Sequence, residues 1–372
     1  LAIKGGDAQK FITNNGSITG SLSLGKGFDS VSNFGRIDGA LNLGDGDNFL
    51  TNDKAGVITQ DVTGLGGIDV VANVGRIEGK LDLGAGGNIV VNGEAGLIVK
   101  GIEGLGGDDV IRNSGVIGTA MATIEIGLGD GKNYLRNSAT GNIFGKVTSG
   151  AGDDQIENAG TITGSVDMGA GDDTVTNDGL VAGNINLGGA TNKNTLTNNG
   201  KGVNGGIRGN VTGGAGVDEV TNSGVIGGNI DLGDGNDKLT LNMGMSVGGT
   251  ISGGNGNDSL ILSNKGVQVR ETLSNTIVNF DNLVVDSNIG DVWVLNNNYT
   301  FGTKVDITTG VVEIAKMMTL ESATVTLDGV VASGRARLQG EGTIKGDLVV
   351  TKGIVTAGNA PTGIGTLSVT GD

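Results

Sequence analysis

The chain has 372 residues, of which 75 are glycine, one is proline and none is histidine or cysteine. These absences exclude histidine-assisted nucleophilic catalysis, thiol chemistry, His/Cys zinc sites and disulfides. With 24 Lys and Arg against 40 Asp and Glu, the formal net charge of −16 argues against a nucleic-acid partner, because such a partner requires a basic surface.

Neither a membrane helix nor a leader is expected in this chain. No run of about 18 apolar residues occurs, as a spanning helix requires. The first residues, 1–5, do not form the charged and then apolar pattern of a secretory signal peptide. A leader that processing has already removed is compatible with this sequence.

A turn of the form Gly-x-Gly-x-Asp/Asn recurs along most of the chain and is its strongest internal signal. Successive turns are 19, 21 or 24 residues apart. We call the last residue of each turn the anchor; the anchors are Asp29, Asn48, Asp69, Asn88, Asp109, Asn133, Asp154, Asp173, Asn194, Asp218, Asp237 and Asp258.

Two further columns keep a fixed distance from the anchor. Two positions after it, the residue is always aliphatic, as in Val71, Val90 and Ile111. Four positions after it, all but Leu241 and Leu262 are asparagine: Asn33, Asn52, Asn73, Asn92, Asn113, Asn137, Asn158, Asn177, Asn198 and Asn222. Ile12 and Asn14 fit the same two columns one repeat earlier.

These columns predict an all-β fold. Alternation such as Ile37-x-Gly39-x-Leu41 has period two, which is typical of strands. A constant offset places identical residues at the same point of each lap, so the chain coils and each lap lies parallel on the last at roughly 4.8 Å. The prediction is a right-handed parallel β-helix, or solenoid, with about 19–21 residues per lap, the hand following from the crossover rule. A narrow interior of this kind explains the scarcity of aromatic residues.

The asparagine column has two interpretations. Stacked amides can hydrogen-bond to the amides above and below them, as in stacked cross-β assemblies. Alternatively, a row of amides can bind a ligand. We favour the structural ladder.

The acidic turns also have two interpretations. Residues 213–221 and 253–261 match the calcium-binding nonapeptide Gly-Gly-x-Gly-x-Asp-x-aliphatic-x, and 150–154 and 169–173 come close to it. That motif works in tandem every nine residues, however, whereas here it occurs once per lap and asparagine often replaces aspartate. An Asx-type turn at a structural corner, in which Asp and Asn serve equally, is therefore favoured.

The repeat changes after Leu262, so we divide the chain into regular laps with the asparagine ladder (1–262) and C-terminal laps that form a folding or cap region (263–372). Four of the ten aromatic residues, namely Phe280, Trp293, Tyr299 and Phe301, lie within 22 residues of one another. Wider and better packed laps account for such a cluster. So does a stable segment that closes the exposed strand edge of a repeat stack.

The last third resembles the passenger domain of bacterial autotransporters. The resemblance is carried by Phe280-x-x-Leu283-x-Val285 with Trp293-x-Leu295, by the strand 340–350, by the turn 358–361 and by the ending Ile-Gly-Thr-Leu-x-Val-x-Gly-Asp at 364–372. It implies a β-helix that is exported through an outer-membrane translocator barrel, absent from this chain, and displayed on the cell surface. The implied C-terminal laps help the passenger to fold outside the cell.

Three functions are weighed. The first is a non-catalytic surface passenger that acts in adhesion or self-association, with identical passengers on neighbouring cells or host surface proteins as partners. The second is a polysaccharide-cleaving β-helix, for which Asp153, Asp154, Asp172 and Asp173 form the densest acidic cluster, without an aromatic residue or long loop beside it. The third is a calcium-stabilised rod. We expect the first and assign no catalytic, cofactor-binding or metal-ligating residue and no cofactor.

Overall fold

The computed structural model contains only β-strands, turns and irregular segments, and it forms a parallel β-solenoid of about 16 turns with roughly 21 residues per turn. It describes residues 2–104, 106–121, 124–189, 192–202, 204–264, 267, 269–329, 336–358 and 365–371. Within these ranges no helix is long and apolar enough to cross a membrane. The turn at 359–361 and residues 364 and 372 of the C-terminal motif lie outside them.

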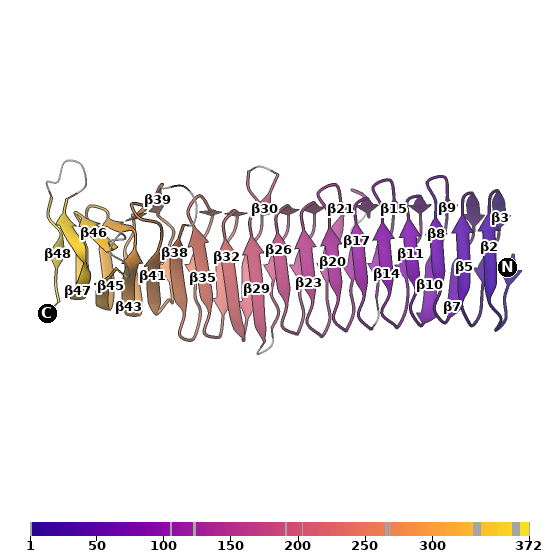
Figure 1. Cartoon of the computed structure of the whole chain (residues 1–372), viewed down its shortest axis with the longest axis horizontal. Coiled ribbons are helices and arrows are strands. Elements are labelled where there is room, and N and C mark those ends of the chain that lie inside the picture. Colours follow the sequence, from indigo (N-terminus) through magenta and orange to yellow (C-terminus); the bar gives the residue numbers. More distant parts are fainter. Residues whose placement is uncertain are drawn as a thin grey trace. The chain divides into compact units, whose positions relative to one another are not determined.

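The chain divides into two compact units, which are described separately. Unit 1 comprises Leu1–Gly188 and Val203–Arg208, and unit 2 comprises Gly189–Gly202 and Gly209–Asp372. In both units the strands of successive laps pair in parallel (Figure 1). The sequence-based division at residue 262 stays a prediction.

Each lap of unit 1 contributes one short strand to each of three sheets, which we call A, B and C. Sheet A contains β1 (Ile3–Lys4), β4 (Leu22–Ser23), β7 (Leu41–Asp45), β10 (Val62–Gly66), β13 (Leu81–Asp82), β16 (Ile102–Glu103), β19 (Ile124–Gly127), β22 (Gly145–Thr148), β25 (Val166–Asp167) and β28 (Ile185–Asn186). Sheet B contains β2 (Lys10–Asn14), β5 (Asp29–Asn33), β8 (Phe49–Asn52), β11 (Val70–Asn73), β14 (Ile89–Asn92), β17 (Val110–Asn113), β20 (Tyr134–Asn137), β23 (Gln155–Asn158) and β26 (Thr174–Asn177). Sheet C contains β3 (Ser17–Thr19), β6 (Arg36–Asp38), β9 (Val57–Ile58), β12 (Arg76–Ile77), β15 (Leu97–Ile98), β18 (Val116–Ile117), β21 (Asn142–Ile143), β24 (Thr161–Ile162), β27 (Leu180–Val181) and β30 (Gly206–Ile207).

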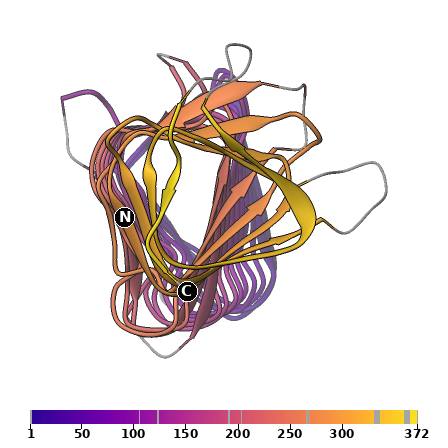
Figure 2. The same ribbon diagram turned by 90° about the vertical axis from the view of Figure 1, so that its left-hand side faces the viewer.

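Unit 2 begins with laps of the same kind and continues with longer strands. Its first part contains β29 (Lys193–Asn198), β31 (Val211–Gly214), β32 (Val217–Asn222), β33 (Val225–Ile226), β34 (Ile230–Gly233), β35 (Lys238–Asn242), β36 (Ser246–Val247), β37 (Ile251–Ser252), β38 (Ser259–Ser263) and β40 (Ile277–Val278). Its second part contains β39 (Arg270–Leu273), β41 (Asn282–Asp286), β42 (Val292–Leu295), β43 (Tyr299–Thr309), β44 (Val311–Ile314), β45 (Thr319–Asp328), β46 (Ala336–Gly340), β47 (Thr343–Ala357) and β48 (Ser368–Val369). Figure 2 shows the laps of this end of the chain facing the viewer.

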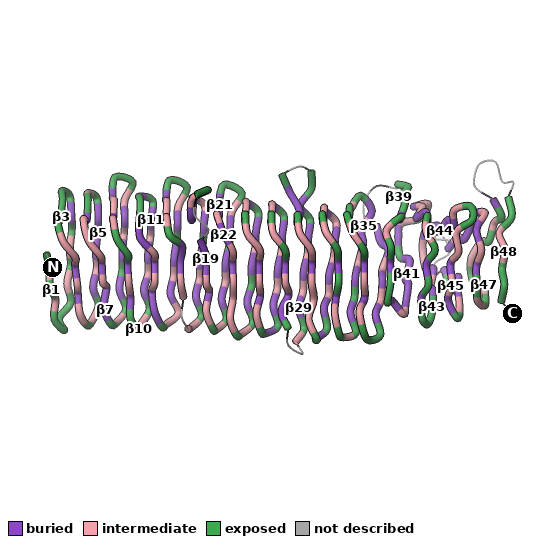
Figure 3. Tube along the Cα trace, turned by 180° about the vertical axis from the view of Figure 1, so that it is seen from behind, coloured by how far each residue is buried: buried purple, intermediate pink, exposed green. Residues whose placement is uncertain are grey.

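The sequence columns coincide with the strand register. Val71 pairs with Val90, and Val90 pairs with Ile111, so the aliphatic column forms a single file. These three side chains are at most 3% exposed. Buried and more exposed residues alternate along the strands (Figure 3), as a period of two requires. The predicted solenoid and its lap length are therefore confirmed.

Aromatic side chains enter the interior in the second part of unit 2. Phe280, Trp293, Tyr299 and Phe301 are each at most 3% exposed. The indole Nε1 of Trp293 donates to Ser287 Oγ (3.0 Å), and the Tyr299 hydroxyl donates to the Leu273 carbonyl (2.7 Å), so their polar atoms are satisfied inside the core. Burial raises the pKa of the Tyr299 hydroxyl.

Candidate functional site

The asparagine column of unit 1 is a continuous ladder of side-chain amides. Each Nδ2 donates to the Oδ1 of the next asparagine along the chain, over 2.8–2.9 Å, from Asn14 through Asn33, Asn52, Asn73, Asn92, Asn113, Asn137 and Asn158 to Asn177. All of these residues are at most 5% exposed. In unit 2, Asn198 donates to Asn222 in the same way (2.8 Å). The structural interpretation of this column is confirmed.

The anchor column forms a second ladder, which joins side chains to the backbone. In unit 1 the backbone N–H at the anchor position of one lap donates to Oδ1 of the next anchor, from Lys10 to Asp29 (2.7 Å) and onward to Asp173. In unit 2, the Asp218 N–H donates to Asp237 Oδ1, and the Asp237 N–H donates to Asp258 Oδ1, both over 2.8 Å. All twelve anchors are at most 3% exposed.

This burial corrects the interpretation of the anchors as corner residues. An Asx turn involves only neighbours in the chain, whereas Oδ1 of ten of the twelve anchors accepts a backbone N–H from the preceding lap. The signal was available in the sequence. Since Val31 and Asn33 face inward with period two, Asp29 has the same parity and must face inward as well.

The aspartate anchors differ from the asparagine anchors in their second side-chain atom. Nδ2 of Asn48 donates to the Gly46 carbonyl (2.8 Å), and Nδ2 of Asn88 donates to the Gly86 carbonyl (2.9 Å). Oδ2 of Asp69 and Oδ2 of Asp109 are buried without a hydrogen-bond partner. Desolvation by burial raises the pKa of both carboxyl groups to about 6.

Two further aspartate anchors, Asp173 and Asp237, combine burial with like charges nearby. Burial is the larger cause, and neighbouring aspartates add to it, so the pKa of Asp173 and that of Asp237 rise to about 7. Asp173 follows Asp154 directly in the column, and Asp237 lies between Asp218 and Asp258. Two adjacent carboxylates in one file repel each other when both are ionised.

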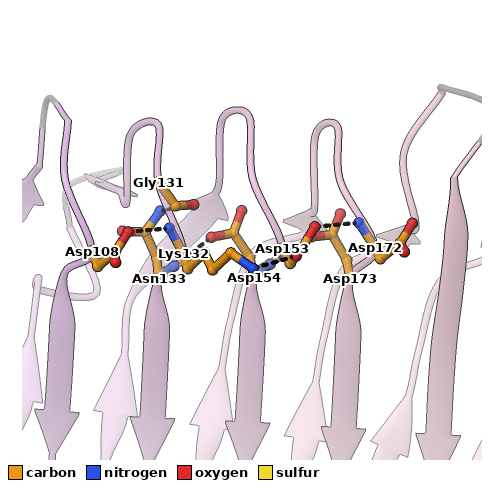
Figure 4. Close-up of polar contacts among 8 residues, drawn as sticks. All are labelled: Asp108, Gly131, Lys132, Asn133, Asp153, Asp154, Asp172 and Asp173. Atoms are coloured by element: carbon orange, nitrogen blue, oxygen red, sulfur yellow. Dashed lines mark hydrogen bonds and ion pairs between the residues drawn. The ribbon is translucent and has the colours of Figure 1, made fainter.

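The outer side of the same turns carries the acidic cluster (Figure 4). Asp153 and Asp172 are exposed, whereas Asp154 and Asp173 are anchors inside the coil. Lys132 Nζ donates to Asp153 Oδ2 (2.7 Å), which lowers the pKa of Asp153 and raises that of Lys132. The backbone N–H of Asp172 donates to Asp153 Oδ1 (3.1 Å). The four carboxylates thus serve two different faces of the turn and do not converge on one substrate position.

The segments that match the calcium nonapeptide also direct their carboxylates inward. Asp218 Oδ2 accepts the Gly214 N–H (2.9 Å), and Asp218 Oδ1 accepts Asn194 Nδ2 (3.0 Å). Asp258 Oδ1 accepts the Asp237 N–H. Among the described residues, no group of three or more His, Cys, Asp or Glu side chains is placed to hold a metal ion.

Surface grooves occur elsewhere in each unit. One of about 490 Å³ in unit 1 is lined by charged and polar side chains that include Lys80, Glu103, Glu125 and Thr148, and Thr148 Oγ1 donates to Glu125 Oε1 (2.9 Å). One of about 740 Å³ in unit 2 follows β40 and is lined by polar residues that include Thr276, Asn279 and Asn298. None of the four clustered aspartates lines either groove.

Sequence reasoning missed a set of aromatic residues on the surface of unit 1. Phe11, Phe28, Phe34 and Phe49 are 73%, 42%, 44% and 37% exposed. The narrow interior explains why they are not inside, but it does not explain why the chain has them. The alternation of side chains along a strand indicates the outward position of Phe11, because Phe11 immediately precedes the inward column position of Ile12.

No protein-family model, curated protein or solved structure matches this chain.

Proposed function

We propose that this chain is the passenger of an autotransporter, displayed on the bacterial surface, where it acts without catalysis in adhesion or self-association. The parallel β-solenoid is the fold that the resemblance of residues 270–372 implies. The proposal also explains the absence of cysteine from the sequence, because a passenger must cross the periplasm unfolded.

One observation carries the proposal: the inward side chains repeat from lap to lap, whereas the outward side chains vary. Inward positions are occupied by aliphatic residues and by the two ladders, and they repeat from lap to lap. Outward positions are not constrained in this way, since Phe11, Ser30 and Phe49 share one column. A fold that fixes its interior and varies a broad outer face is suited to contact with other surfaces.

The test is display of the chain on a bacterial strain that does not clump. Fusion to a translocator barrel should produce settling of the culture or attachment to host cells. Proteolytic release of the passenger from the same cells is the matched control and should abolish either effect. If the displayed chain, confirmed at the surface by antibody, causes neither settling nor attachment, the proposed function is wrong.

A further inference from the structure

The outward face of five strands of sheet B, namely β2, β5, β8, β11 and β14, carries no charged side chain. Two residues of each strand point outward, and the ten together form what we call the uncharged face: Phe11, Thr13, Ser30, Ser32, Phe49, Thr51, Val70, Ala72, Ile89 and Val91. Charge returns on the next strands, where Arg112 and Arg136 continue the file of Val91.

Exposed aromatic and aliphatic residues extend this face over the adjoining turns. Phe28 and Ile68 each lie one residue before an anchor, and Phe34 and Val74 immediately follow their strands; the four are between 39% and 49% exposed. The lap between them carries Asp47 and Asp53 at these two positions, so the uncharged face itself is confined to the strands. The rings of Phe11 and Phe28 lie 6.2 Å apart at an interplanar angle of 50°. The fold does not require the Phe11 ring, because serine occupies the same column at Ser30.

A contiguous apolar patch of this kind marks an interaction site on a soluble surface. The centres of protein interfaces are depleted of charge and enriched in aromatic residues, as this face is. A chain with a net charge of −16 repels its own copies, so contact between two copies is favoured over a region that brings few like charges together. The uncharged face meets that requirement.

We propose that the uncharged face is the surface through which two copies of this chain associate, with their β2–β14 strands packed face to face about a twofold axis. This inference rests on the self-association part of the proposed function and names its surface and partner. A flat sheet is self-complementary under a twofold axis, and stacked sheets pack about 10 Å apart. The Phe11 and Phe28 pair would then bury its rings against the partner copy.

The size of the face sets the strength of the contact. Five strands about 4.8 Å apart and five residues of about 3.3 Å each, the length of β2 or β5, span roughly 400 Å² per copy. Two copies would bury about 800 Å², below the usual range of specific interfaces. The free chains should therefore associate weakly, whereas many copies on two opposed surfaces gain from multivalency.

The experiment measures self-association of the purified chain by sedimentation equilibrium, together with settling of cells that display it. The double variant Phe11→Ser, Phe49→Ser replaces both rings with serine, the residue that the lap between them has at this position (Ser30). It should weaken dimerisation roughly tenfold and slow settling. Met121→Ser removes a fully exposed hydrophobic side chain outside the face and should change neither. Urea unfolding of each variant confirms that the fold is intact.

Charged substitutions at Thr51, on the middle strand of the five, test whether the partner is a second copy. Thr51→Lys and Thr51→Glu should each be monomeric alone, since each places like charges across the axis, and their mixture should associate again. If association and settling persist unchanged in the phenylalanine and Thr51 variants, this inference is wrong while the proposed function stands. If the variants lose host-cell attachment although the wild type never self-associates, the occupant is another molecule and the inference is equally wrong.

Discussion

At the scale of single residues, the anchor position shows how one column accommodates two residue types. Asp and Asn present the same Oδ1 to the backbone N–H of the preceding lap, so that bond is preserved in both. The difference is confined to the second atom, which is a satisfied donor in Asn48 and an unpartnered acceptor in Asp69. An unpartnered buried acceptor costs free energy, and a buried charge costs more.

Replacing such an aspartate with asparagine should stabilise the protein. At pH 7.5, Asp69→Asn removes a desolvated charge and supplies an amide that can donate to a turn carbonyl, as Asn48 and Asn88 do. We expect the free energy of unfolding to rise by about 1–3 kcal/mol. Urea unfolding at pH 7.5 measures this change, with the exposed Asp45→Asn as a control that should have no effect. An equal or lower stability of Asp69→Asn would contradict the assignment of Oδ2 as unsatisfied.

The same carboxyl groups predict that stability falls as pH rises. Their pKa in the folded state is about 6 for Asp69 and Asp109 and about 7 for Asp173 and Asp237, above the value of about 3.9 in an unfolded chain. Between pH 4 and pH 8 the folded state therefore binds more protons than the unfolded state, and the free energy of unfolding decreases with increasing pH. The urea midpoint should be higher at pH 5 than at pH 8. A midpoint that rises over this range would show that these groups ionise normally in the fold.

The amide ladder predicts a loss of stability when one rung is removed. Asn113 accepts from Asn92 (2.9 Å) and donates to Asn137 (2.8 Å), and it is fully buried. Asn113→Leu removes one of the acceptors of Asn92 Nδ2 and removes the Asn113 donor of Asn137 Oδ1, so it should cost about 1–3 kcal/mol in urea unfolding. Arg112→Leu, the outward neighbour, is the control and should stay within about 0.5 kcal/mol of the wild type. Equal stabilities of the two variants would show that the amide ladder does not stabilise the fold.

At the scale of strands and turns, register is held by the columns, and the turns absorb differences in length. The turn 53–56 between β8 and β9 is two residues longer than the turn between β5 and β6. It is closed by a hydrogen bond from the Gly56 N–H to the Asp53 carbonyl (2.7 Å). Val31, Leu50 and Val71 nevertheless remain in one file. Lap lengths of 19 and 21 therefore coexist in one solenoid.

Glycine is required where the backbone passes close to a buried anchor. A Cβ atom at Gly104 would clash with Asp109 Oδ2 and lie 2.6 Å from the Leu128 carbonyl, whereas a Cβ at Gly106 would meet nothing within 4 Å. Gly104→Ala should therefore cost about 1–3 kcal/mol and Gly106→Ala almost nothing, although the two positions are two residues apart. Thermal unfolding of both variants checks this contrast. Similar losses in both would mean that the backbone, not the neighbouring carboxylate, imposes glycine here.

The sequence was sufficient for features that repeat with the lap and insufficient for features that depend on a neighbour in space. The spacing of Val71, Val90 and Ile111 predicted their file, and the asparagine column predicted the ladder. The inward position of Asp69 and the outward position of Phe11 were missed, because a local turn motif and a composition count both ignore strand parity. The boundary at Leu262 and the passenger assignment remain predictions.

At the scale of the whole molecule, side-chain contacts link each lap mainly to its neighbours, as is typical of repeat proteins. Stability is then distributed along the chain. The carboxylates of the calcium-like segments already accept backbone N–H groups, as with Asp218 and Asp258.

Removal of divalent ions should consequently leave the protein unchanged. We expect the same melting temperature in EDTA as in millimolar calcium, measured by circular dichroism at fixed ionic strength and pH. Magnesium at the same concentration is the control for general screening of the net charge of −16. A melting temperature that rises with calcium alone would favour the calcium-stabilised rod instead.

The amide ladder from Asn14 to Asn177 has a direction, since every rung donates toward the C-terminal side. Aligned amide dipoles add head to tail, as peptide units do in an α-helix, and each bond polarises the next. Within the file the two sides of each rung are therefore chemically unlike: Oδ1 faces the preceding lap and Nδ2 faces the following lap. A lap inserted between two rungs must present its acceptor to the lap before it and its donor to the lap after it, so laps can be joined in one polarity only.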